Sequence, residues 1–178
     1  MNATVKVWDP LVRVFHWSLV LCFAVAWASA DEWQDLHEIT GYTVAALVSF
    51  RLLWGLAGPR YARFRQFVRH PRIVVEYLSD MLKGREVRYL GHNPAGGMMV
   101  VALLMGLGVL TLTGWLYTDL LWGAEWVEES HEWLANLLLA LAGLHVAGVI
   151  LASVRHRESL VKSMLTGRKR MPDETDVS

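Results

Sequence analysis

Cysteine is almost absent from this chain, because Cys22 is the only one among 178 residues. A single cysteine excludes an intramolecular disulfide, a CxxC redox pair, a cysteine-ligated zinc or iron–sulfur site, and covalent haem attachment through CxxCH. Net charge is absent too, since 17 basic residues balance 17 acidic ones, and this balance argues against nucleic acid as a partner. The informative signals are therefore the apolar runs and the placement of the charges.

Apolar residues are abundant, at 54% of the chain, and the mean hydropathy is +0.30. Four apolar runs are each close to the roughly 20 residues that a helix needs to cross a bilayer. They cover residues 11–30, 36–57, 94–117 and 131–154. We therefore expect an all-α fold, a four-helix integral membrane bundle that occupies residues 1–165. The polar, charged stretch 166–178 is predicted to be a disordered tail.

The charges are segregated along the chain. Neither the connection between the first two runs nor that between the last two contains Lys or Arg, and together with the adjoining helix ends they carry nine acidic residues. These are Asp31, Glu32, Asp35, Glu38, Asp119, Glu125, Glu128, Glu129 and Glu132. Basic residues lie near both termini and in the middle segment. The positive-inside rule then predicts cytoplasmic termini and acidic loops on the outer side.

The middle segment, residues 61–88, mixes Arg and Lys with apolar residues at near-helical spacing, interrupted by Pro71. This pattern predicts an amphipathic helix on the inner leaflet, with a solvated linker as the alternative. Asn93 is predicted to cap the third span, and Pro94 to be its first helical residue.

Four histidines lie in or at the edge of the spans, where an ionisable side chain is costly and suggests function. His131 and His145 are 14 residues apart, close to four helical turns, and so share one face near opposite membrane surfaces. His37 matches the depth of His131, and His16 that of His145. Two facing pairs are what two six-coordinate b-type haems need, since imidazole supplies both axial ligands.

Neighbouring residues fit this hypothesis. Gly41 lies one turn after His37 and leaves room for a porphyrin edge, although small residues also serve helix packing. Arg51 lies 14 residues beyond His37, on the same face and at the inner depth. A haem propionate would be its partner, with Arg13 as another candidate, unless Arg51 extends to the inner surface.

Several motifs resemble one family. VKVWDPLVRVFHW, LHEITGY, RLLWGLAGPRYARF, YLGHNPAGG and HEWLANLLLALAGLHVAGV together resemble the bacterial cytochrome b561 family, which includes the cytochrome b subunits of Ni,Fe-hydrogenases. The resemblance implies an inner-membrane protein with two haems b that exchanges electrons with quinone. It implies His16 and His145 as ligands of the inner haem iron, and His37 and His131 as ligands of the outer one.

The expected function is electron transfer between a periplasmic partner and the quinone pool, with no catalytic side chain. The acidic outer loops favour a basic partner such as a c-type cytochrome, or a redox enzyme complex. The alternatives are a superoxide:quinone oxidoreductase of the same family and a haem-free metal or proton transporter. Self-association into a homodimer is left open.

Overall fold

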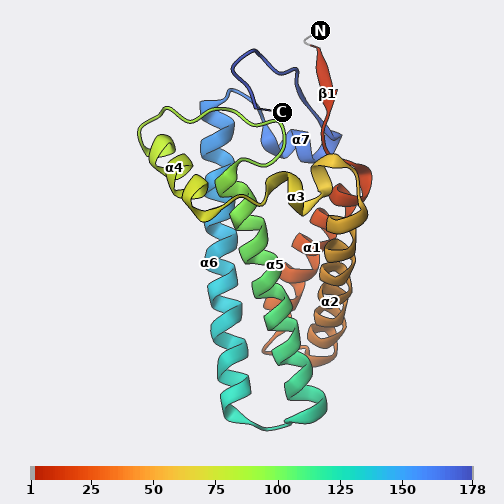
Figure 1. Ribbon diagram of the computed structural model, residues 1–178. Helices are drawn as coiled ribbons and strands as arrows, with labels where there is room; N and C mark the ends of the chain where they lie inside the picture. Colours follow the sequence, from red (N-terminus) through yellow and green to blue (C-terminus); the bar gives the residue numbers. More distant parts are fainter. Residues whose placement is uncertain (1–2, 178) are drawn as a thin grey trace. The chain divides into compact units, whose positions relative to one another are not determined.

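The computed structural model describes residues 3–177 and is dominated by four long helices (Figure 1). They are α1 (Pro10–Ser29), α2 (Gln34–Ala57), α5 (Pro94–Trp115) and α6 (Glu125–Arg155). All four are long and apolar enough to cross a membrane. The four predicted spans and the all-helical membrane fold are therefore confirmed.

The helices extend beyond the apolar runs at the acidic loop between α5 and α6. A π-turn, η2 (Leu116–Leu120), continues α5, and α6 begins six residues before His131. Glu125 and Glu128 lie in the first turn of α6, where a carboxylate interacts favourably with the positive end of the helix dipole. The apolar run shows which residues would lie in the hydrocarbon of the membrane. The helix itself is longer, because its backbone hydrogen bonds continue into the polar residues beyond that run.

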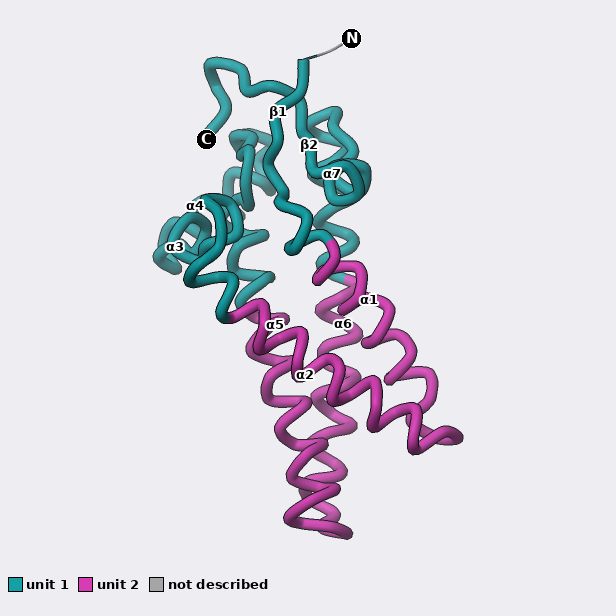
Figure 2. The backbone as a smooth tube through the Cα atoms, turned by 90° about the vertical axis from the view of Figure 1, so that its right-hand side faces the viewer, with its two compact units in different colours: residues 1–13, 53–101, 144–178 teal, residues 14–52, 102–143 magenta. Residues whose placement is uncertain are grey.

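The chain divides into two compact units (Figure 2). Unit 1 contains the residues up to Arg13, Leu53–Val101 and the residues from Leu144 onward; unit 2 contains Val14–Leu52 and Ala102–Gly143. Unit 2 carries both acidic loops. Unit 1 carries the basic middle segment and both ends of the chain.

Unit 2 is packed through close helix contacts. A Cβ atom on Gly106 of α5 would lie 2.7 Å from Cδ2 of Leu138 on α6, so the glycine lets the two helices approach. Leu138 is buried, as is Val127 in the first turns of α6. Contacts through small residues are typical of helix pairs in membranes, where water does not drive association.

In unit 1 the middle segment folds into η1 (Arg60–Ala62), α3 (Phe64–Phe67) and α4 (Pro71–Leu82). The predicted amphipathic helix is α4, which begins at Pro71. Val74 and Tyr77 of α4 are buried, whereas Val75 and Leu82 are exposed. The helix therefore packs one apolar strip inward and leaves another uncovered.

The start of α5 agrees with the sequence. Pro94 is the first helical residue, and Oδ1 of Asn93 accepts a hydrogen bond from the Gly96 amide at 2.6 Å. Gly97, one residue on, allows close packing, because a Cβ there would lie 2.5 Å from the Phe67 carbonyl oxygen.

The prediction of a disordered tail from Thr166 is wrong. Thr166 ends helix α7 (Leu160–Thr166), and β2 (Arg168–Arg170) then pairs antiparallel with β1 (Thr4–Lys6). Farther along, the Asp176 carboxylate forms a buried ion pair with Arg88. The tail has too few apolar residues for its composition to predict an ordered structure. It is ordered because β2 pairs with β1 and because Asp176 forms a buried ion pair with Arg88.

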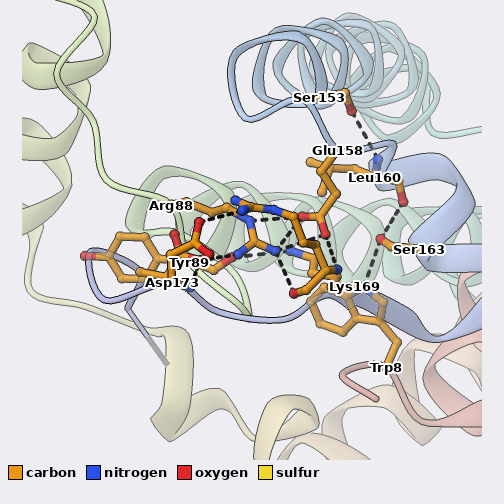
Figure 3. Close-up of polar contacts among 11 residues, drawn as sticks. Trp8, Arg88, Tyr89, Ser153, Glu158, Leu160, Ser163, Lys169 and Asp173 are labelled. Carbon is orange, nitrogen blue, oxygen red and sulfur yellow. Dashed lines mark hydrogen bonds and ion pairs between the residues drawn. The ribbon is translucent and has the colours of Figure 1, made fainter. Parts of the chain in front are cut away.

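Figure 3 shows the polar centre that fixes the tail. The Arg88 guanidinium donates to both carboxylate oxygens of Glu158, at 2.9 and 3.2 Å, and to the Arg170 carbonyl at 3.1 Å. Arg88 and Glu158 side chains are only 5% and 9% exposed. A buried pair of charges stabilises only when its remaining hydrogen bonds are made, and here they are made by the tail itself.

Candidate functional site

Two of the predicted histidines meet in unit 2. His37 of α2 and His131 of α6 have ring centres 5.9 Å apart, with their ring planes inclined by 71°. Both side chains are half-buried. The sequence placed these two residues at one depth, and the structure brings them together.

The orientation of His37 is set by a backbone carbonyl. Its Nδ1 lies 2.8 Å from the Ala26 carbonyl oxygen of α1. A carbonyl only accepts hydrogen bonds, so Nδ1 carries the proton in the neutral ring. The lone pair is then on Nε2, which is the nitrogen available to bind a metal.

The orientation of His131 is set by a hydroxyl. Nδ1 of His131 lies 3.0 Å from Oγ1 of Thr113 on α5, and the same hydroxyl donates to the Leu110 carbonyl at 2.8 Å. A hydroxyl has one proton, and here it points to the carbonyl, so Oγ1 accepts from Nδ1–H. His131 therefore also presents the Nε2 lone pair. Second contacts of this kind orient metal-binding histidines in many proteins.

The spacing of the two rings fits a pair of axial ligands. A metal–imidazole bond is about 2 Å long, so two imidazoles bound on opposite sides of one metal have ring centres about 6 Å apart. Among residues 3–177, no group of three or more His, Cys, Asp or Glu could hold a bare metal ion. Two histidines without further ligands suit an iron that brings its own planar ring, which is haem.

Two glycines border the histidine pair. At Gly41, one turn beyond His37, a Cβ would meet no atom within 4 Å, so this side of the helix is open. At Gly114, by contrast, a Cβ would lie 3.2 Å from Cε1 of His131. The open side at Gly41 is compatible with the edge of a porphyrin ring. Gly114 lets α5 approach the His131 side chain.

Two acidic side chains accept hydrogen bonds from tyrosines in this part of unit 2. Tyr42 of α2 donates from its hydroxyl to Oδ2 of Asp119 at 3.0 Å, and Tyr117 donates to Glu128 at 3.3 Å. The first contact connects α2 to η2, and the second connects η2 to the first turn of α6. Asp31 and Glu32 come a few residues before His37, and Glu125 and Glu128 a few residues before His131, so acidic residues precede both histidines along the chain.

The other predicted site residues are placed separately. His16 belongs to unit 2 and His145 to unit 1, so their pairing stays a prediction. Arg51 is 3% exposed in unit 2. Arg13 lies in unit 1 against Gly167, where a Cβ would be 2.8 Å from its Nη1; Gly167 has a φ of +80° and closes α7.

Three features were missed by sequence reasoning. Thr113 lies 18 residues before its histidine on another helix, and only its position near the same end of a span hints at the contact. His92 packs between the rings of Trp8 and Phe67, with ring centres at 4.8 and 4.5 Å. Lys169 is 5% exposed, and burial lowers the pKa of its amine to about 8.

Four helices of membrane-crossing length, two of which bring a pair of histidines together, place the chain among helical membrane proteins. The sequence profile of prokaryotic cytochrome b561 matches residues 7–167, and the chain belongs to that family. A probable Ni/Fe-hydrogenase B-type cytochrome subunit of Rhodobacter capsulatus is 24% identical over 220 aligned residues, which cover 97% of this chain and 84% of that protein. No solved structure gives a significant match.

Membership in this family makes the protein a b-type cytochrome of the bacterial inner membrane. Its cofactor class is haem b, and its activity is transmembrane electron transfer. The number of haems, their ligands and the redox partners depend on the residues of the particular chain.

Proposed function

We propose that the protein transfers electrons through two haems b, between a periplasmic redox partner and the membrane quinone pool. His37 and His131 hold the outer haem, and His16 and His145 hold the inner one. The observation that carries this proposal is the pair of imidazoles with ring centres 5.9 Å apart, each with its Nδ1 hydrogen-bonded.

When bound, haem b supplies a reversible one-electron iron couple. The chain supplies ligation, orientation and burial. The Ala26 carbonyl and the Thr113 hydroxyl orient the imidazoles of His37 and His131 so that their Nε2 atoms are available. Little rearrangement of these side chains would therefore be needed when haem binds.

The inner site rests on the sequence. His145 follows His131 by 14 residues on α6, and His16 lies near the other end of α1 from the acidic loop. Arg51 and Arg13 are the proposed partners of the haem propionates, because a guanidinium matches a carboxylate with two parallel hydrogen bonds. Gly41 is proposed to border the outer haem.

The direction across the membrane follows from the charges. Cytoplasmic termini and a cytoplasmic middle segment are the topology that the positive-inside rule favours. The inner haem then lies toward the cytoplasm, and the proposed quinone exchange is at that side. The outer haem lies beneath the acidic loops.

The outer partner is proposed to be basic. The two connections near His37 and His131, with the adjoining helix ends, carry nine acidic residues and no basic ones, which would steer a cationic protein such as a c-type cytochrome toward the outer haem. The relative's name supports a redox enzyme complex as the other candidate. The same charges repel superoxide, an anion, and so disfavour a superoxide oxidase.

The test is haem content of single-histidine variants purified in detergent. His37→Ala and His131→Ala should each lose the same haem and about half of the Soret absorbance, because a pair shares one iron. His16→Ala and His145→Ala should each lose the other haem, distinguished by its midpoint potential. Loss of different haems by His37→Ala and His131→Ala would disprove the pairing. Wild-type protein without a Soret band would instead favour a haem-free transporter.

A further inference from the structure

A second candidate site lies in unit 1, and no histidine lines it. A cavity of about 270 Å³ is lined by Arg60, Arg63, Arg65 and Gln66. Three of its four lining residues are arginines and the fourth is a neutral amide. A cavity with three guanidinium groups and no carboxylate is suited to an anion.

The walls of this cavity are held in place by packing. Phe67 of α3 is 1% exposed. Phe64 lies against the end of α2, where a Cβ on Gly55 would be 2.1 Å from Cε2 of its ring. Nε of Arg63 donates to the Gly58 carbonyl at 2.5 Å, which fixes the side chain and leaves its two terminal nitrogens for a ligand. The cavity is thus largely formed before any ligand binds.

Acidic residues are missing from the segment that forms the cavity. The sequence has no Asp or Glu between Glu38 and Glu76, and among residues 3–177 neither Arg63 nor Arg65 pairs with a carboxylate. Five other arginines of unit 1 form ion pairs with carboxylates, namely Arg72, Arg85, Arg88, Arg155 and Arg170, whereas Arg69, Arg157 and Arg168 form none among residues 3–177. No carboxylate of the described residues therefore neutralises the charges of Arg63 and Arg65, which leaves these two guanidinium groups able to bind an anion.

The depth of the cavity points to the kind of anion. Helix α2 ends at Ala57, and Arg60 follows three residues later. Leu53 and Leu56, in the last turn of α2, are 69% and 75% exposed, as expected of side chains that contact acyl chains. Groups just beyond the end of a membrane span lie at the level of the lipid headgroups.

The geometry points to a binding site for the headgroup phosphate of an acidic phospholipid, formed by Arg60, Arg63 and Arg65. The charge requirement excludes zwitterionic lipid as the preferred ligand. All five basic residues from Arg60 to Arg72 are arginines, which bind phosphate oxygens in pairs, whereas a lysine acts as a point charge. The site does not depend on the proposed haem ligation.

The test is lipid binding to the purified full-length protein in a neutral detergent, measured by native mass spectrometry. The probe is phosphatidylglycerol, with phosphatidylcholine and inorganic phosphate as separate arms. Arg63→Gln/Arg65→Gln is compared with Arg72→Gln/Arg85→Gln, which removes two charges from the same unit outside the cavity. Size-exclusion profiles and far-ultraviolet circular dichroism show that both variants fold.

Phosphatidylglycerol affinity should fall about thirtyfold in the cavity variant and less than about threefold in the control. Arg63→Lys/Arg65→Lys should lose an intermediate amount, because charge remains and paired hydrogen bonding is lost. Equal losses in the cavity and control variants would overturn the proposal, as would equally tight binding of phosphatidylcholine. Displacement of the lipid by equimolar inorganic phosphate would assign the cavity to a small anion instead.

Discussion

The Nδ1 proton of each outer imidazole is held by a different kind of acceptor. His37 donates to a backbone carbonyl, which no substitution of a side chain removes. His131 donates to the Thr113 hydroxyl, which in turn donates a hydrogen bond to the Leu110 carbonyl. Thr113 is therefore a proposed positioning residue for His131, and a mutation can remove its hydroxyl without changing either proposed haem ligand.

Thr113→Val should lower the affinity of the outer haem about tenfold, as loss of a second contact to a metal-bound histidine commonly does. It should also raise the midpoint potential of that haem alone, because a histidine without its Nδ1 hydrogen bond is a weaker donor to iron. Haem titration and a redox titration followed by absorbance measure the two effects.

Thr113→Ser should restore both values, since it keeps the hydroxyl. Thr111→Val is the matched control, because the Thr111 hydroxyl donates to the Leu107 carbonyl on its own helix. An unchanged potential in Thr113→Val, or an equal shift in Thr111→Val, would show that the hydroxyl does not act through His131.

At the scale of elements, the sequence was sufficient to predict the lengths of the helices and the depths of residues along them, because both depend only on helix geometry. Membrane thickness sets helix length, and a rise of about 1.5 Å per residue converts sequence distance into depth. The depths of His37 and His131 could therefore be matched from the sequence alone. The Thr113 contact could not, because it depends on how two helices pack side by side.

The tail shows what could not be predicted from the sequence. Strand β2 and the residues after it are polar, and local composition predicts disorder. Their order comes from partners distant in sequence, namely β1 and Arg88. Pairing over such separations leaves no periodic signal in the tail itself.

Lys169 on β2 makes the stability of the folded tail depend on pH. Burial lowers the pKa of its amine from 10.5 to about 8 in the folded protein. Between these values the unfolded chain binds the extra proton, so the free energy of unfolding rises with pH from about 8 toward 10.5. The charged amine costs the folded state stability below about pH 8.

Lys169→Met removes this buried amine and should raise the thermal unfolding midpoint at pH 7. Its advantage over wild type should shrink as the pH approaches 10, where the wild-type amine is neutral when folded. Thermal unfolding in detergent from pH 7 to pH 10 measures the trend. Lys162→Met, at an exposed position on α7, should change the unfolding midpoint by the same amount at every pH. If the gain in midpoint from Lys169→Met is also the same from pH 7 to pH 10, the lowered pKa of the Lys169 amine is refuted.

At the scale of the whole molecule, zero net charge conceals an unequal distribution of charge between the two units. The acidic loops belong to unit 2, and the basic middle segment belongs to unit 1. One set of charges is proposed to attract a soluble redox protein, and the other to hold lipid phosphate. The same segregation that favours one membrane orientation therefore also separates two kinds of partner.

Asp31→Asn/Glu32→Gln/Glu129→Gln should slow electron transfer to a basic cytochrome c about tenfold at low ionic strength, because long-range attraction raises the rate of encounter. All three side chains are exposed; Asp31 and Glu32 lie between α1 and α2, and Glu129 lies near the start of α6. The reduced protein is mixed with cytochrome c in a stopped-flow instrument over a range of salt concentrations.

In detergent both units are accessible to cytochrome c, so the unit on which it docks needs its own control. Glu76→Gln/Asp80→Asn/Glu174→Gln removes the same charge from unit 1 and should leave the rate within about twofold of wild type. Wild type and the outer variant should converge near 1 M salt, where the screening length is about 3 Å. If both triple variants slow equally, net charge rather than the outer surface governs the encounter. If the wild-type rate does not depend on salt, the partner is not recruited by charge, and contact with a subunit of a stable redox complex becomes the better account of the acidic loops.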